Sequence, residues 1–401
     1  MKILFITSFY SALKESVMSN DWNPSGMPAI VKLFEGLKKR TIDFESYFVD
    51  RSSNNDECLK IQNKMFNNEV KILKVSKKLN VKFLRSIGES YNSFLIYKKI
   101  KRTCQYYDVI YVDRANLVIG AFFAFTGKKV VLRLHGVTDF YENYSKLYFR
   151  LMNPLKLLCL RAPFDYIICS EDGSPGKQFL KKYTKAKFNI TLLNGVDDVR
   201  KKRTLESVKK DLSIKEGIPI FLFLSRLSKD KGILEFIKGV VEIQKQGLIF
   251  HTVIVGAGKY YKIVKEIIDN EKLENISLTG AVKHSDVYTY FQLCDVYVSL
   301  NMIGNLSNTV LEAVNAGKCI ITLDKSRSPL RDISTYDFFN TAAIFLNRDN
   351  INEELKKVIT RLIKDPALIE DRKKEIINCQ SKLQTWSQRI DVEINYITNE
   401  V

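Results

Sequence analysis

The sequence has 401 residues, and its 63 Lys and Arg against 45 Asp and Glu give a formal net charge of +18. A hydrophobic content of 45% supports folded cores and argues against global disorder. The length predicts two domains or one large domain. No apolar run reaches the about 18 residues of a membrane-spanning helix. The seven cysteines include no C-x-x-C pair, which argues against zinc and a disulfide framework and fits a reducing cytosol.

Short apolar segments alternate with helical periodicity along the whole chain. The first, 2–7, is interpreted as a buried β-strand rather than a signal peptide, because no small-residue cleavage site follows it. Further strands are predicted at 44–49, 109–112, 129–134, 166–169, 189–193, 218–224, 251–255, 276–278, 296–300, 319–323 and 343–346. Helices are clearest at 29–39, 232–244, 259–270, 286–293 and 308–316. Unbroken strands alternating with helices predict an α/β fold of doubly wound parallel sheets.

A charged stretch at 199–216 contains few large apolar residues and predicts a domain boundary. We therefore expect Rossmann-like domains at 1–196 and 205–380. The helical tail 381–401 is long enough to return to the first domain and complete it.

The positive charge is concentrated in the first half. Residues 1–200 hold 33 basic and 19 acidic residues, a net +14, which leaves 63 − 33 = 30 basic and 45 − 19 = 26 acidic residues, a net +4, for the rest. The window 71–105 holds ten basic residues and Glu89 as its one acid. Basic and apolar residues alternate at 71–78 and 94–102, which favours an amphipathic surface on anionic lipid. A solvated charged face is the bland alternative, and nucleic acid is a third, although no recognised motif accompanies the charge.

Two cations follow the strand predicted at 218–224. Arg226 ends it, and Lys231 is expected to open the next helix. The carboxyl ends of parallel strands are where open α/β sheets bind ligands, and two fixed cations there suit a diphosphate. The alternative is solvated surface charge, although a lysine at a helix N-terminus opposes the helix dipole.

A small, polar loop precedes the helix predicted at 308–316. Free backbone N–H groups at such a helix start can hold a phosphate or sugar oxygen, or Ser307 or Asn308 can simply cap the helix. Glu312 lies one turn into that helix. It is either a ligand for sugar hydroxyls or an exposed helix carboxylate.

His135 follows a predicted buried strand and precedes Gly136. It either contacts a substrate or is structural. Gly256 and Gly258 follow another strand, but Tyr261 stands where the dinucleotide fingerprint needs a third glycine, which favours a tight structural turn.

Together these segments resemble family 4 of the retaining glycosyltransferases with the GT-B fold, over most of the chain. The resemblance is carried by Ser-Arg-Leu-Ser-Lys-Asp-Lys-Gly at 225–232, Val-Gly-Ala-Gly at 255–258, Leu-Glu-Ala-Val-Asn-Ala-Gly-Lys at 311–318, Leu-His-Gly at 134–136 and Leu-Asn-Gly-Val-Asp at 193–197. It implies two Rossmann-like domains facing a central cleft, the first binding the acceptor and the second binding the donor.

Two positions depart from the family pattern. Family members usually carry a second glutamate eight positions before the one matched by Glu312, and here that position is Gly304. Some relatives without that acid have a loop that resembles Asn305-Leu306-Ser307-Asn308. In the glycine pair near the amino terminus, Gly26 is present but Met27 replaces its partner.

The resemblance implies transfer of a sugar from a UDP-, GDP- or ADP-sugar with retention. No cluster of metal ligands is visible in the sequence, so we expect a reaction that needs no metal or other cofactor. Arg226 and Lys231 stabilise the departing diphosphate, Glu312 binds the ribose and His135 faces the donor sugar. Donor contacts also come from the loop Gly304, Asn305, Leu306, Ser307, Asn308 and Thr309, and from Gly26.

The acceptor is then a glycan or lipid-linked glycan, as in bacterial capsule, O-antigen or exopolysaccharide assembly. The expected location is cytoplasmic, peripheral on the inner face of the membrane, with no nucleic-acid partner. Two rival hypotheses keep the fold: a GT-B nucleotide-sugar epimerase, and a degenerate transferase that only binds glycan or a partner subunit.

Overall fold

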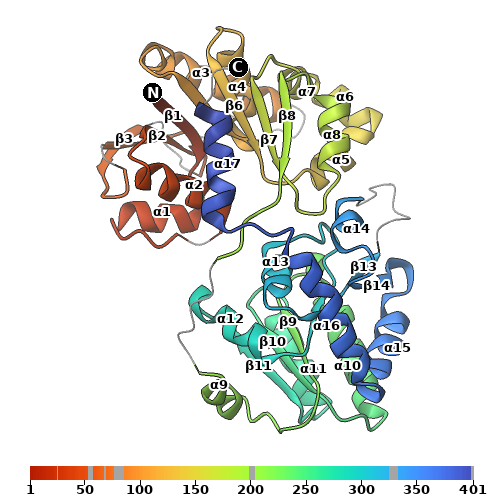
Figure 1. Ribbon diagram of the computed structural model, residues 1–401. Helices are drawn as coiled ribbons and strands as arrows, with labels where there is room; N and C mark the ends of the chain where they lie inside the picture. The colour runs from red at the N-terminus through yellow and green to blue at the C-terminus, as the bar shows by residue number, and fades with distance from the viewer. Residues whose placement is uncertain are drawn as a thin grey trace. The chain divides into compact units, whose positions relative to one another are not determined.

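The computed structural model describes residues 1–24, 26–52, 57–66, 69–75, 85–197, 204–324 and 333–398. The chain forms two compact units (Figure 1). Unit 1 comprises Met1–Glu171, Gly176–Leu193 and Trp386–Val401. Unit 2 comprises Asn194–Thr385 and the short loop Asp172–Pro175.

Unit 1 contains an eight-stranded sheet in the order β3-β4-β2-β1-β5-β6-β7-β8. Neighbouring strands are parallel except β3 and β4, which are antiparallel. The strands are β1 (Lys2–Ser8), β2 (Asp43–Asp50), β3 (Glu57–Gln62), β4 (Glu69–Lys74), β5 (Val109–Asp113), β6 (Lys129–Leu134), β7 (Tyr166–Ser170) and β8 (Phe188–Leu192).

Helices cover both faces of this sheet. Leu4 and Ile6 of β1 pack with α3, α4, α7 and α8, whereas Ile3 and Phe5 pack with α1, α2 and α17. Because both faces are covered, the central strands are apolar without alternation. The helices are α1 (Ser11–Met18), α2 (Pro28–Lys39), α3 (Arg85–Cys104), α4 (Leu117–Ala124), α5 (Thr138–Ser145), α6 (Leu147–Met152), α7 (Pro154–Leu160), α8 (Gly176–Tyr183) and α17 (Trp386–Thr398).

The carboxyl-terminal helix α17 belongs to unit 1 and lies beside α2 (Figure 1). Gly36 permits this approach, because a Cβ there would lie 2.5 Å from Ile390 Cγ2. On the inner side of α17, the buried Glu393 accepts a hydrogen bond from the Tyr111 hydroxyl and pairs with Arg133 (3.6 Å) and Arg389. The tail of the chain is therefore tied to the sheet by a buried charged network.

Unit 2 contains a six-stranded parallel sheet in the order β11-β10-β9-β12-β13-β14. The chain starts in the middle at β9, runs outward to β11 and then returns to β12, so the strand order reverses between β9 and β12. Ligands of doubly wound sheets bind at this reversal. The strands are β9 (Ile220–Leu224), β10 (His251–Val255), β11 (Ile276–Gly280), β12 (Val296–Ser299), β13 (Cys319–Asp324) and β14 (Ile344–Asn347).

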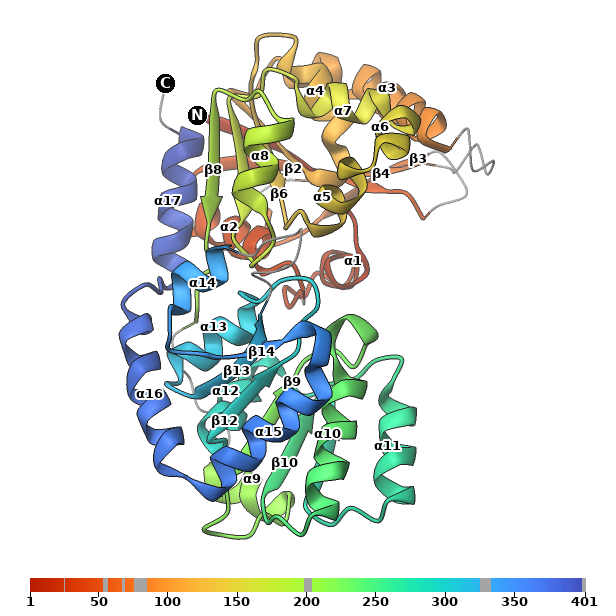
Figure 2. The ribbon, with the colours of Figure 1, turned by 90° about the vertical axis from the view of Figure 1, so that its right-hand side faces the viewer.

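Helices α10, α11 and α15 cover one face of this sheet, and α12, α13 and α16 cover the other (Figure 2). The helices of unit 2 are α9 (Leu205–Asp211), α10 (Ile233–Lys245), α11 (Tyr261–Asn270), α12 (His284–Leu293), α13 (Asn308–Asn315), α14 (Ile333–Phe339), α15 (Ile351–Lys364) and α16 (Ala367–Gln380). In the part of the chain that the structure describes, no helix combines the length and apolarity needed to cross a membrane.

The α/β prediction is confirmed, and each predicted strand is present within a few residues of its expected ends. The sequence missed the hairpin of β3 and β4. Lys71 and Lys74, expected on an amphipathic surface, lie in strand β4, while Lys77 and Lys78 fall outside the described residues. In the other basic segment, 94–102, the cations are exposed, but Ile96, Tyr97 and Ile100 are buried in the core of unit 1. The prediction that the apolar side chains of this segment form a lipid-facing surface is therefore wrong for Ile96, Tyr97 and Ile100.

Candidate functional site

The loop after β9 carries Arg226 and Lys231 to the edge of the sheet where its strand order reverses. Arg226 is exposed, and Lys231 ends a 3-10 turn, Lys229–Lys231. Helix α10 begins at Ile233, so Lys231 lies in the 3-10 turn two residues before the helix. The expectation that Lys231 opens the helix is therefore wrong. Burial, together with the nearby Arg226 cation, lowers the pKa of Lys231, although the Asp230 carboxylate opposes this. The Arg226 and Lys231 cations therefore lie close enough to act on each other.

Close backbone packing holds this loop in place. A Cβ on Gly232 would lie 2.5 Å from Leu300 Cβ, and Met302 N donates to Asp230 O (2.8 Å), so the loops after β9 and β12 are tied together. A Cβ on Gly256 or Gly258 would overlap the backbone carbonyls that follow β9. The glycine pair after β10 therefore permits loop packing, in agreement with its predicted structural role.

A cavity of about 240 Å³ lies between these two loops. Arg226 and Lys231 line one side, and Ser307, Asn308 and Thr309 at the start of α13 line the other. The cavity therefore joins two cations to a helix N-terminus, and both favour bound anions.

The start of α13 carries no side-chain cap. Ser307 occupies the cap position, but its hydroxyl bonds the Thr309 hydroxyl (3.0 Å) instead of a backbone N–H. Thr309 also bonds the Tyr297 hydroxyl (3.0 Å), and the Asn194 side chain donates to Asn308 Oδ1 (2.8 Å). Since the side chains are occupied with one another, the first backbone N–H groups of α13 are left for a ligand.

Three residues expected in the donor loop have structural roles. Asn305 is fully buried and donates to Leu323 O (2.7 Å), and Leu306 is part of the core. Gly304 lies against the loop Asp172–Pro175, where a Cβ would overlap the Asp172 carbonyl oxygen. That same oxygen accepts a hydrogen bond from Leu306 N (3.1 Å). The missing family glutamate is thus excluded by backbone from elsewhere in the chain.

Asp172 brings a carboxylate close to the cations. Its charge acts on Lys231, and its Oδ1 accepts a hydrogen bond from Ser174 N (3.0 Å). Asp172 is not among the residues predicted from the sequence. Its only sequence signal is its position just after the predicted strand 166–169, which is shared by many structural residues.

Glu312 lies one turn into α13 and does not line the cavity itself. Burial, with a further contribution from the nearby Asp197 carboxylate, raises the pKa of Glu312 to about 8. His284 Nε2 lies 3.5 Å from Glu312 Oε1. An acid that stays protonated at neutral pH, beside a second acid, is typical of a functional position. The proximity of Asp197 to Glu312 was not predicted from the sequence.

His135 and Gly26 belong to unit 1. Burial, with the Arg133 and Arg114 cations, lowers the pKa of His135 to about 3, so the imidazole is neutral. Its buried Nε2 has no hydrogen-bond partner among the described residues. Gly26 has φ of +75°, and Met27, which caps α2, has φ of +45°. Both lie in the left-handed region, which explains why the family prefers glycine at both positions.

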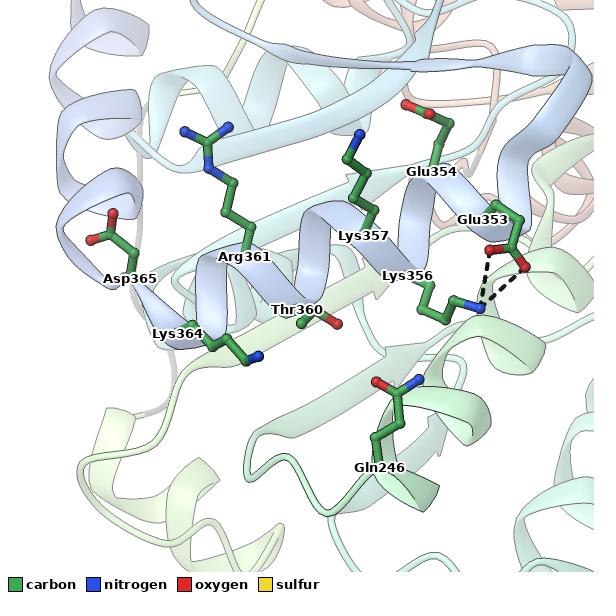
Figure 3. Close-up of a pocket in the computed structure, with 9 residues that line it drawn as sticks. All are labelled: Gln246, Glu353, Glu354, Lys356, Lys357, Thr360, Arg361, Lys364 and Asp365. Carbon is green, nitrogen blue, oxygen red and sulfur yellow. Dashed lines mark hydrogen bonds and ion pairs between the residues drawn. The ribbon is translucent and has the colours of Figure 1, made fainter.

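A larger groove of about 560 Å³ runs along α15 near Gln246 (Figure 3). Its long side chains carry both charges, and Lys356 turns toward Glu353 (3.1 Å). Gln246 ends α10, so the groove lies at the edge of the sheet opposite Arg226. We interpret it as a solvated surface between two helices.

Part of the chain matches a known protein family. Residues 206–380 match the family described as glycosyl transferases group 1. An α-monoglucosyldiacylglycerol synthase of Acholeplasma laidlawii is 25% identical over 169 residues, 41% of this chain and 40% of that protein. The matched segment thus spans less than half of that relative.

Solved structures match over nearly the whole chain. Alr3699/HepE of Anabaena in complex with UDP has a TM-score of 0.69 at 16% identity and covers 98% of this chain and 100% of its own. WaaG, a glycosyltransferase involved in lipopolysaccharide biosynthesis, has a TM-score of 0.65 at 14% identity, with both chains fully covered. At sequence identities this low, the structural similarity establishes only that this chain has the GT-B fold.

Proposed function

We propose that this chain, whose residues 206–380 match the glycosyl transferases group 1 family, transfers a sugar from a nucleoside diphosphate sugar to an acceptor with retention of configuration. The observation that carries this proposal is the cavity in unit 2, where Arg226 and Lys231 face the uncapped start of α13. Its position where the strand order reverses is the usual place for a nucleotide in such a sheet.

The two cations act on the leaving group. As the bond between the anomeric carbon and the diphosphate oxygen lengthens, negative charge develops on the diphosphate. Arg226 and Lys231 stabilise that charge, and the first backbone N–H groups of α13 take other phosphate oxygens. The departing phosphate oxygen accepts the proton of the acceptor hydroxyl, so the reaction needs no separate base.

Glu312 binds the ribose hydroxyls of the donor. A carboxyl group that is protonated in the empty site both donates and accepts hydrogen bonds, which matches paired hydroxyls.

The donor sugar is recognised without the usual first glutamate. We assign the recognition of the donor sugar to the Asp172 carboxylate. The backbone of Asp172 fills the space beside Gly304, where the family glutamate would stand, and its carboxylate interacts electrostatically with Lys231. His135 provides a hydrogen bond to a substrate hydroxyl through its unpaired Nε2, and its low pKa argues against a role as general base.

The proposed acceptor is a membrane lipid or a lipid-linked glycan, in the assembly of bacterial surface polysaccharide. Two observations support this: the net +14 of residues 1–200 suits an anionic membrane surface, and the relative from Acholeplasma is named for a diacylglycerol product. The protein would then work at the inner face of the membrane.

Thermal unfolding with UDP, GDP and ADP tests the donor site. A nucleotide at about a hundred times its Kd adds about 2.7 kcal/mol to the free energy of unfolding, so at least one should raise Tm with concentration. For the nucleotide that binds, a panel of its sugar derivatives is then tested for sugar transfer and for hydrolysis. If no nucleotide shifts Tm, the donor-site assignment is wrong; binding without transfer or hydrolysis of any donor would favour a non-catalytic relative.

A further inference from the structure

The surface of unit 1 carries a concentrated apolar patch on α6 and α7. Six large apolar side chains between positions 147 and 158 are exposed: Leu147, Tyr148, Leu151, Met152, Leu155 and Leu158. Leu151 is 71% exposed and Leu158 is 62% exposed. Single exposed leucines are ordinary, but six large exposed apolar side chains on two neighbouring short helices indicate an interaction site.

The two helices have separate inner and outer sides. Cys159 and Leu160 are buried, and Phe149 and Leu157 pack partly against the same core. Helix α7 packs on α4, and Figure 2 shows α6 and α7 next to each other. The inner side chains therefore hold the helices to the protein, and the outer leucines are not needed for the fold.

Positive charge surrounds the patch. Lys146, Arg150, Lys156 and Arg161 accompany it, and no Asp or Glu occurs between positions 143 and 164. Lys156 pairs with Glu89 of α3 (2.9 Å), so the patch adjoins that helix. On α3 itself, Lys98, Lys99, Lys101 and Arg102 are exposed.

We propose that α6 and α7, residues Leu147–Leu160, are the element by which this protein docks on an anionic bilayer. The leucines enter the boundary between headgroups and acyl chains, and the surrounding cations contact lipid phosphates. The helices are too short to span a membrane, so they lie in its plane. The segment 143–164 carries no acid of its own, and Lys156 pairs with the neighbouring Glu89. The six exposed apolar side chains have no use for a soluble phosphate ligand, which favours a lipid surface. The proposal rests on the membrane acceptor proposed above.

The test is co-sedimentation with vesicles of phosphatidylglycerol and phosphatidylcholine in equal parts, beside vesicles of phosphatidylcholine alone. The variant L151S/L158S replaces two exposed side chains, so its fold should persist. Its partition onto the anionic vesicles should fall by about tenfold or more. The matched control I249S/I377S, which removes two exposed isoleucines of unit 2 (61% and 53% exposed), should bind as the wild type does.

The outcomes separate this inference from the proposed function. Equal binding of L151S/L158S and wild type to the anionic vesicles overturns the inference, and so does wild-type protein that binds neither kind of vesicle. If the variant instead abolishes a wild-type dimer in solution without changing vesicle binding, a second copy covers the patch and the proposal is wrong. The Tm shift by nucleotide is measured on the same samples: its absence in the wild type counts against the donor site, whereas its retention in the variant shows that only docking was lost.

Discussion

The backbone carbonyl oxygen of Asp172 occupies the space that a side chain on Gly304 would need. The same oxygen accepts a hydrogen bond from Leu306 N, so the loop after β7 is fixed against the loop before α13. A glutamate cannot be accommodated at position 304 unless one of these loops moves. The departure from the family pattern is therefore built into the packing of unit 2.

Replacing Gly304 should destabilise unit 2. G304A forces the two loops apart, and overpacking of this kind costs about 1–3 kcal/mol. Chemical denaturation of G304A, compared with I303A at the exposed neighbouring position, measures the difference. An alanine variant as stable as the wild type would show that the loops yield without cost.

Replacing the Asp172 carboxylate should affect the donor sugar more than the nucleotide. D172N keeps the backbone carbonyl and therefore the loop contact, but it removes the charge near Lys231. We expect unchanged nucleotide affinity, a kcat/KM lowered by about tenfold or more, and weaker discrimination between sugar donors. E171Q, at the preceding residue, which pairs with Lys177 (2.9 Å), is the matched control. An unchanged donor profile in D172N would remove Asp172 from the sugar site.

Arg226 and Lys231 should stabilise the transition state of sugar transfer. Removing one group that stabilises developing charge typically lowers kcat by about a hundredfold or more, so R226A and K231A should each show this loss with an unchanged fold. Lys229 lies on the same turn, is exposed and does not line the cavity, so K229A should be nearly as active as the wild type. Retained activity in K231A would contradict the leaving-group assignment.

The raised pKa of Glu312 predicts a pH-dependent stability. The folded state holds a proton on this group up to about pH 8, whereas the unfolded chain releases it near its ordinary value of 4.5. The free energy of unfolding is therefore highest below pH 4.5 and falls between pH 4.5 and about 8. The side chain is 20% exposed, and we expect a loss on the order of 2 kcal/mol.

The measurement compares unfolding of E312Q and wild type between pH 5 and about 9. The glutamine variant cannot ionise and should lack this decline. In D197N the loss should be smaller, because one neighbouring negative charge is gone. Parallel curves for wild type and E312Q would show that Glu312 titrates normally.

The buried carboxylate of Glu393 should be needed to hold α17. Burial opposes its ionisation, but Arg133 and Arg389 lower the pKa of Glu393 to about 2. E393Q leaves two buried guanidinium groups without their counter-ion, which costs about 3–5 kcal/mol. The free energy of unfolding measures this cost, with D391N on the outer side of the same helix as the comparison. Equal stability of the two variants would show that the network is dispensable.

Most of the fold was predictable because its signals are local. Apolar strands such as 220–224, and the amphipathic spacing of α10 and α13, follow from burial of side chains close together in the sequence. Strand β3 was missed because it lies at the sheet edge, where Leu59 and Ile61 alternate with exposed polar residues and give a weak pattern. The apolar patch on α6 and α7 was missed because the sequence does not distinguish leucines that are buried from those that are exposed.

The sequence alone determined the class of fold, the order of its elements and the cations that follow β9, because each depends on periodicity or on a short segment. Only the tertiary structure decided how position 304 is filled, which carboxylate neighbours Glu312 and which apolar residues face solvent. These properties depend on pairs such as Gly304 and Asp172, which are distant in sequence and meet only because the chain returns the loop after β7 to unit 2.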